Sequence, residues 1–164
     1  METVAQALEM LYGRGAGVAE AQRARYRVLE ERFRALFPTH ARARFFSAPG
    51  RTEIGGNHTD HQSGRVLAAA INLDTAAAVA PNGDMVANLH SEGFAPLRVE
   101  LSDLSPREAE KNTTAAIVRG CAARMRELGY AVGGFDAART SSGCGGPGTS
   151  ASAAGEGCAG AVRS

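Results

Sequence analysis

The most informative stretch of this sequence is APGRTEIGGNHTDH, residues 48–61. It follows a short expected strand at residues 44–47, and its glycines and proline indicate a loop rich in polar groups. Arg51 offers a planar fork of donors that suits a phosphate or a carboxylate. His58 and Asp60 are short hydrogen-bonding side chains of the kind that bind the paired hydroxyls of a sugar. From the residues alone, a structural alternative has equal weight: Asp60 caps a helix and the histidines only pack.

A metal site is a second functional interpretation of the same stretch. Residues 58–61 read HTDH, which is the end of the H-x-H-x-D-H pattern typical of metallo-β-lactamase-like hydrolases. Gly56 stands where the leading histidine of that pattern is required, so the ligand set is incomplete. A metal-dependent hydrolase that uses His58, Asp60 and His61 is therefore the less favoured alternative.

The bulk composition is that of one ordinary globular domain. The chain has 164 residues, of which 44% are hydrophobic and 21% charged, and its formal net charge is +1. Such a balance gives no indication of nucleic acid or of a membrane surface as a partner, and we expect a cytoplasmic protein. Lys111 is the only lysine, which excludes a P-loop because that loop needs a lysine directly after its glycines. Three cysteines without a CxxC pair favour neither a disulfide framework nor a zinc site.

Helical periodicity marks two segments. Residues 18–37 carry apolar side chains at spacings of three and four, and Pro38 predicts the end of this helix. Ser105 and Pro106, followed by acidic residues, predict the start of a second helix that Gly129 ends.

Strand patterns fill the sequence between these two helices. Strands are expected at residues 44–47, 66–71, 75–80, 85–89 and 97–101. The sequence PNGD at residues 81–84 is typical of a hairpin turn between two adjacent strands. Helix, strands and helix in this order predict an α+β fold rather than a parallel α/β sheet.

A second candidate site is the glycine-rich segment GGPGTSASAA, residues 145–154. Small residues allow the backbone to approach a ligand, and successive amides at a helix start form a phosphate cradle. On composition alone, a flexible linker is the commoner outcome for such a segment.

The first stretch resembles the signature of the galactokinases, within the superfamily of galacto-, homoserine, mevalonate and phosphomevalonate (GHMP) kinases. The resemblance lies in APGR at residues 48–51 and HTD at residues 58–60. It implies a truncated GHMP-kinase amino-terminal domain with the α+β fold of ribosomal protein S5 domain 2. The implied reaction is ATP-dependent phosphorylation of the anomeric hydroxyl of galactose or a related sugar. By position, Arg51 is the implied transition-state stabiliser.

The sugar-binding residues that the resemblance implies are Asn57, His58, Thr59 and Asp60, with Asp60 the best candidate for a hydroxyl contact. The sequence departs from the family in two places. Asn57 stands where galactokinases usually have glutamate, and His61 where they usually have tyrosine. Asparagine can still bind a hydroxyl, but the lost charge weakens the case for strict galactose specificity.

The glycine-rich segment is similar to the nucleotide loop of the same family, G-x-G-L-S-S-S-A. It implies ATP and Mg²⁺ as cofactors, with Ser152 as the residue that helps to hold the magnesium ion. The implied nucleotide-binding residues are Ser91, Gly146, Pro147, Gly148, Thr149, Ser150, Ala151 and Ser152.

Three segments organise the chain in this interpretation. Residues 1–40 form an amino-terminal helical segment, residues 41–140 the α+β domain with the sugar loop, and residues 141–164 a degenerate nucleotide loop and truncated tail. Glycines in that tail weaken a helix, which suggests a sequence error, a pseudogene or a degraded gene end. The family's catalytic aspartate follows the nucleotide loop and is absent here; Asp136 precedes that loop and is interpreted as a turn residue.

We therefore expect the chain to be inactive alone as a kinase, although sugar and ATP are its expected small-molecule partners. A stand-alone sugar- or nucleotide-binding remnant of such a kinase is the second possibility.

Overall fold

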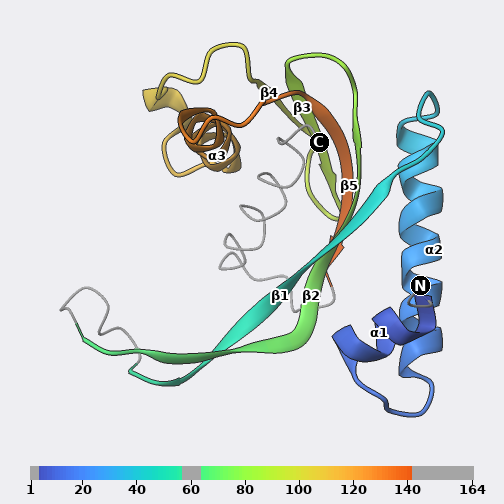
Figure 1. The fold of residues 1–164 in the computed structure, drawn as a ribbon. Helices are drawn as coiled ribbons and strands as arrows, with labels where there is room; N and C mark the ends of the chain where they lie inside the picture. Colours follow the sequence, from blue (N-terminus) through green and yellow to red (C-terminus); the bar gives the residue numbers. More distant parts are fainter. Residues whose placement is uncertain (1–3, 57–63, 142–164) are drawn as a thin grey trace.

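The computed structural model describes residues 4–56 and 64–141. Figure 1 shows a twisted sheet with α1 and α2 on one side and α3 on the other. The elements follow one another in this order: α1 (Val4–Tyr12), α2 (Val18–Leu36), β1 (Arg44–Gly55), β2 (Leu67–Pro81), β3 (Val86–Ser91), β4 (Leu97–Glu100), the 3-10 turn η2 (Glu108–Glu110), α3 (Thr114–Glu127) and β5 (Phe135–Ser141). Within the described ranges, no helix is long and apolar enough to cross a bilayer.

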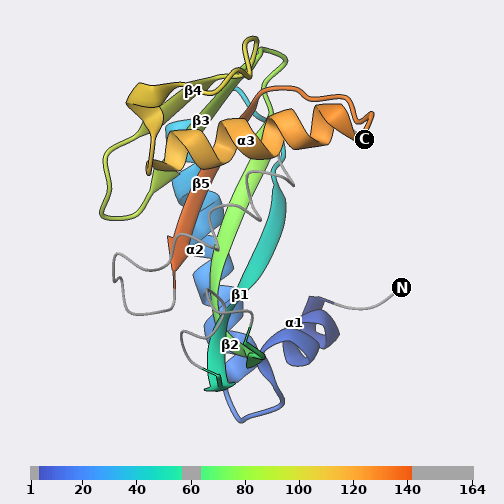
Figure 2. The ribbon, with the colours of Figure 1, turned by 90° about the vertical axis from the view of Figure 1, so that its left-hand side faces the viewer.

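The five described strands form one mixed sheet in the order β1-β2-β5-β3-β4. The β3 and β5 strands run parallel, whereas the other neighbouring pairs are antiparallel. Helices at the chain start and after β4 cover its two faces (Figure 2). The α+β class predicted from the sequence is therefore confirmed.

Alternation along β2 creates two cores, one on each face of the sheet. Ala76, Ala78 and Ala80 lie against Leu29 and Phe33 of α2. The intervening residues face the other way, into a core with α3 that also includes residues of β3, β4 and β5. Successive side chains of a strand point to opposite faces, so a run of small residues lets helices approach the sheet from both sides. The helix predicted over residues 18–37 is confirmed, because its apolar stripe buries Leu29 and Phe33.

The hairpin predicted at residues 81–84 is wrong in its pairing. The chain does turn there, but β5 lies between β2 and β3, so these two strands are not hydrogen-bonded to each other. The turn is hydrogen-bonded instead to Gly134, the residue before β5. The Asn82 main-chain amide donates to the Gly134 carbonyl, and the Gly134 amide donates to the Asp84 carbonyl. A turn signal predicts a reversal of the chain, but it does not say whether a later strand is inserted.

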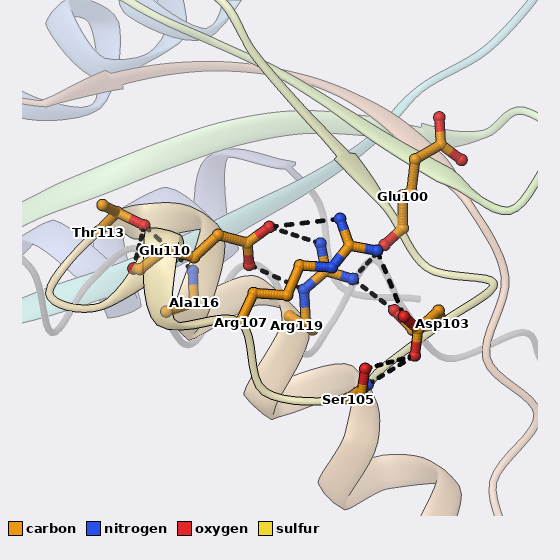
Figure 3. Close-up of polar contacts among 8 residues, drawn as sticks. All are labelled: Glu100, Asp103, Ser105, Arg107, Glu110, Thr113, Ala116 and Arg119. Carbon is orange, nitrogen blue, oxygen red and sulfur yellow. Dashed lines mark hydrogen bonds and ion pairs between the residues drawn. The ribbon is translucent and has the colours of Figure 1, made fainter.

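The second helix begins later than the sequence predicts, at Thr114 instead of Ser105. Figure 3 shows the cause, which is a loop held by Arg119 from inside α3. The Arg119 guanidinium donates two bonds to the Glu110 carboxylate, at 2.7 and 2.8 Å, and others to the main-chain oxygens of Glu100 and Asp103. The hydrogen bond from Arg119 lowers the pKa of the Glu110 carboxyl. These contacts hold residues 100–110 ahead of the helix, and α3 begins only after them.

The first two strands are much longer than predicted. The strand expected at residues 44–47 continues to Gly55, and the two strands expected within residues 66–80 are one continuous β2. Pro49 does not end β1, because β1 is an edge strand and its outer side needs no backbone donor. Beyond the sheet, residues 50–55 of β1 and 67–73 of β2 form a two-stranded ribbon, which we call the arm. Figure 1 shows the arm projecting away from the helices.

Candidate functional site

The arm carries the described part of the first sequence motif. Arg51 lies on β1 opposite Ala70 of β2, and 71% of its side chain is exposed. Its guanidinium lies 3.6 Å from the Glu53 carboxylate, an exposed ion pair of the kind that contributes little to stability. Arg51 is therefore open to a ligand. Residues 57–60, for which the sequence predicts sugar contacts, follow the arm directly and lie outside the described residues.

The base of the arm contains a buried aspartate that the sequence analysis missed. Asp74 is 4% exposed and stands opposite Pro49, the last pair before the register shifts. Its carboxylate accepts hydrogen bonds from Ser47 at 2.5 Å, Arg25 at 2.5 Å and Tyr12 at 2.6 Å. These donors come from β1, α2 and α1, so one carboxylate joins three other elements.

These same contacts stabilise the negative charge of Asp74. Burial alone raises the pKa of Asp74, but the hydrogen bonds from Ser47, Tyr12 and Arg25 outweigh it and place the pKa below its ordinary value of 3.8. Burial, with the hydrogen bonds to Asp74 and Tyr26, raises the pKa of Tyr12 above its usual range. The cluster is therefore an ionised carboxylate surrounded by neutral and cationic donors at neutral pH.

A second buried aspartate lies at the far end of β2 from the arm. Asp136 was interpreted from the sequence as a turn residue, yet it lies within β5 and is 7% exposed. His40 lies 2.7 Å from one carboxylate oxygen, and the amides of Asn82 and Asn88 donate to the other at 2.9 and 2.7 Å. Burial opposes its ionisation, but these contacts lower its pKa overall. Its register partner is Ala80, so this cluster joins β3 and β5 to the segment after α2.

The structure describes one of the predicted nucleotide-binding residues. Ser91 ends β3, and its hydroxyl accepts a hydrogen bond from Nε of Arg139 on the neighbouring parallel strand β5. Residues 146–152 and the metal-ligand candidate Ser152 lie outside the described residues. Within residues 4–56 and 64–141, no group of three metal-ligating side chains occurs. His58, Asp60 and His61, on which the hydrolase alternative depends, also lie outside this part.

The Asp74 cluster could have been suspected from one sequence signal. An acidic residue within the small, apolar stretch LAAAINLDTAAAVA, residues 67–80, is costly to bury unless it is paired. Its partners could not have been named, since Tyr12, Arg25 and Ser47 are 62, 49 and 27 positions away in the sequence.

Comparison with known proteins finds similarity to galactokinases. Residues 31–81, which include β1, β2 and the segment between them, match the galactokinase galactose-binding signature. Over these residues the chain is similar to the galactokinases. The galactokinase of Bacillus subtilis is 33% identical over 106 residues, which is 63% of this chain and 27% of that protein. The galactokinase of Streptomyces coelicolor is 34% identical over 126 residues, 76% of this chain and 32% of that protein. The chain thus spans about a third of these galactokinases.

Solved galactokinase-superfamily structures share the fold. The Lactococcus lactis galactokinase, solved in complex with galactose, superposes with a TM-score of 0.62 at 24% identity and covers 73% of this chain and 31% of that one. The mevalonate kinase of Methanococcus jannaschii gives a TM-score of 0.53 at 16% identity, over 70% of this chain and 38% of that one. The predicted GHMP-kinase domain is therefore confirmed as a fold. The comparisons give the hydrolase alternative no support.

Proposed function

We propose that this chain provides the sugar-binding part of a galactokinase-type kinase, which phosphorylates the anomeric hydroxyl of galactose or a related sugar. The observation that carries the proposal is the match of residues 31–81 to the galactose-binding signature. That match covers the two strands of the arm, on which Arg51 is exposed, and it includes residues 57–60, which begin six positions after Arg51 in the sequence.

The proposed roles follow the chemistry of phosphoryl transfer. Most of such catalysis is positioning and charge stabilisation, so an exposed guanidinium near the migrating phosphoryl group would stabilise the developing charge. Arg51 is our candidate for that role. Asn57, His58, Thr59 and Asp60 are the proposed sugar contacts, and Asp60 accepts from a sugar hydroxyl in this scheme.

The nucleotide side of the proposal rests on sequence. Residues 146–152 are the proposed phosphate cradle, and Ser152 the proposed ligand of Mg²⁺. ATP would supply the transferred phosphoryl group. Ser91 is a further proposed contact, and its hydroxyl, which accepts from Arg139, can still donate its proton to a nucleotide oxygen.

Sugar binding is the property to measure first, on the 164-residue chain itself. Calorimetric titration with galactose should show binding that Asp60→Ala abolishes and that Arg51→Ala leaves within a few-fold. Arg98→Ala is the matched control, because Arg98 is an exposed arginine of β4 that is paired with Glu100 in the same way. Two outcomes contradict the proposal: the unsubstituted chain does not bind galactose, or Asp60→Ala binds it as well as the unsubstituted chain does.

Phosphoryl transfer is the second measurement and separates the two functional alternatives. Fusing residues 1–137 to the remainder of the Bacillus subtilis galactokinase adds the part of that relative that the 164-residue chain does not span. We expect transfer from ATP to galactose in the fusion and none in the chain alone, with Arg51→Ala lowering transfer far more than galactose affinity. Binding without transfer in the fusion would favour the stand-alone binding remnant.

A further inference from the structure

The arm has few contacts of its own that could hold its direction. Ile54 is 64% exposed, Leu67 62% and Leu73 47%, and no helix of the described chain packs on residues 50–55. An isolated two-stranded ribbon is only marginally stable in water. The direction of the arm must therefore be set where it leaves the sheet.

The place where the arm leaves the sheet is the Asp74 cluster. Pro49 and Asp74 form the last regular pair, and the register shifts before the next pair, Arg51 and Ala70. Gly50 lies in that shift, where a Cβ atom would stand 3.0 Å from the Leu73 carbonyl oxygen, so the strands are tightly apposed at the bend.

The cluster fixes this bend to the rest of the molecule from several sides. Ser47 of β1 and Asp74 of β2 are joined by the hydroxyl–carboxylate bond. Arg25 of α2 donates to the Asp74 carboxylate, to its carbonyl oxygen at 3.3 Å, and to the carbonyl oxygen of Thr140 in β5 at 3.4 Å. Tyr12, the last residue of α1, completes the set and bonds Tyr26 at 2.8 Å. Through these contacts β1 and β2 are linked to α1 and α2 at the base of the arm.

A small change of angle at this bend has a large effect at the far end of the arm. Gly55, the last residue of β1, is six positions beyond Pro49, which is about 20 Å along an extended strand. A rotation of about 10° at the base would move that end by about 3–4 Å, given this rise per residue. Catalytic and binding groups lose their effect when they are displaced by about 1 Å.

We propose that Asp74, with Tyr12, Arg25 and Ser47, is a positioning cluster that sets the direction of the arm and thereby places Arg51 and the end of β1, after which residues 57–60 follow in the sequence. None of these four residues needs to touch the sugar. The part about the sugar rests on the proposed function, whereas the part about the arm does not. The cluster also gives α1 a role in the site, through Tyr12.

The test compares two variants that remove equivalent charges, Asp74→Asn and Asp136→Asn. Both aspartates are buried, and each accepts hydrogen bonds from several side chains, but Asp136 pairs with Ala80 at the end of β2 remote from the arm. Hydrogen exchange is followed by mass spectrometry in peptides that cover residues 50–56 and 64–73. We expect exchange there to be at least about tenfold faster in Asp74→Asn than in Asp136→Asn at equal global stability, adjusted with denaturant.

Galactose affinity is the second readout, and it separates the two hypotheses. We expect Asp74→Asn to weaken galactose binding about tenfold or more and Asp136→Asn to leave it within twofold. Equal arm exchange in the two variants overturns the positioning role. A clear difference in exchange together with no galactose binding by the unsubstituted chain retains the positioning role and rejects the proposed function.

Tyr12→Phe keeps the test decisive if Asp74→Asn does not fold. It removes one hydroxyl and leaves the ion pair of Asp74 with Arg25, so the protein should fold. Arm exchange should still rise about threefold, as expected for the loss of one hydrogen bond. Tyr130→Phe is the matched control, since Tyr130 is exposed and lies in the segment after α3. Unchanged arm exchange in Tyr12→Phe overturns the proposal.

Discussion

The strands β1 and β2 have two different environments along their length. In the sheet, residues 76–80 of β2 are buried between helices on both faces. In the arm, the same two strands are exposed on nearly every residue, and the side chain of Arg51 is 71% exposed. The difference indicates that the β1–β2 hairpin has two roles. Its part within the sheet, which we call the inner half, stabilises the fold, and the arm presents the groups of the proposed site. Substitutions in the two halves should therefore have separable effects.

The largest effect should come from Phe33→Ala, in the helix α2 that packs on the inner half. Phe33 is 1% exposed and packs against the alanines of β2, so its removal leaves a cavity between α2 and the sheet. We expect the free energy of unfolding to fall by about 3–5 kcal/mol, measured by urea denaturation. Ile54→Ala in the arm is the matched substitution, and its effect should stay within about 0.5 kcal/mol. Similar losses of unfolding free energy in Phe33→Ala and Ile54→Ala would contradict the two separate roles of the hairpin.

A smaller effect of the same kind is expected at Gly134, directly before β5. A Cβ atom there would lie 2.4 Å from the Val86 carbonyl oxygen and 2.5 Å from that of Asp84, and both are backbone atoms that cannot rotate away. Gly134→Ala should therefore destabilise the protein by about 1–3 kcal/mol. Gly120→Ala within α3 meets nothing within 4 Å and should instead stabilise it by about 0.5–1 kcal/mol. Thermal melts of the pair should shift in opposite directions.

Acid unfolding should reveal how much the two buried, ionised aspartates contribute to stability. Both Asp74 and Asp136 have a pKa below the ordinary 3.8 in the folded protein, so each contributes stability that is present above 3.8 and is lost as pH falls through the folded value. We expect stability to decline steeply below about pH 4 and the decline to be shallower in Asp136→Asn. Unfolding curves between pH 2 and 6 measure the slope. If the slope is the same in Asp136→Asn, ionisation of Asp136 does not contribute to the pH dependence of stability, and the prediction is wrong.

Local patterns in the sequence were sufficient for the helix that packs on the inner half and for the fold class. The period of residues 18–37 fixes α2 because an amphipathic helix has one buried stripe, and Leu29 and Phe33 lie in it. The motif at residues 48–61 was sufficient for the resemblance to galactokinases and the fold class. These features depend on neighbours within a few positions, which is why a single sequence reveals them.

Non-local contacts account for what the sequence did not reveal. The insertion of β5 between β2 and β3 depends on a strand about 50 residues after the turn at residues 81–84. The late start of α3 depends on Arg119, which binds the loop before its own helix. The Asp74 cluster needs Tyr12 and Arg25 from two helices. Nothing in the local sequence around Asp74 or the turn specifies such distant partners.

The smallest effect on stability should come from Arg51→Ala, and that is why it is informative. Arg51 is exposed and its described partner is Glu53, at 3.6 Å, so its removal should change the free energy of unfolding by less than about 0.5 kcal/mol. Urea denaturation with Arg98→Ala as control checks this. A loss above about 1 kcal/mol would show that the arginine supports the fold, and a functional defect in the same variant could then no longer be attributed to the site. A neutral result leaves the exposed guanidinium without a structural reason and favours its proposed role at the phosphoryl group.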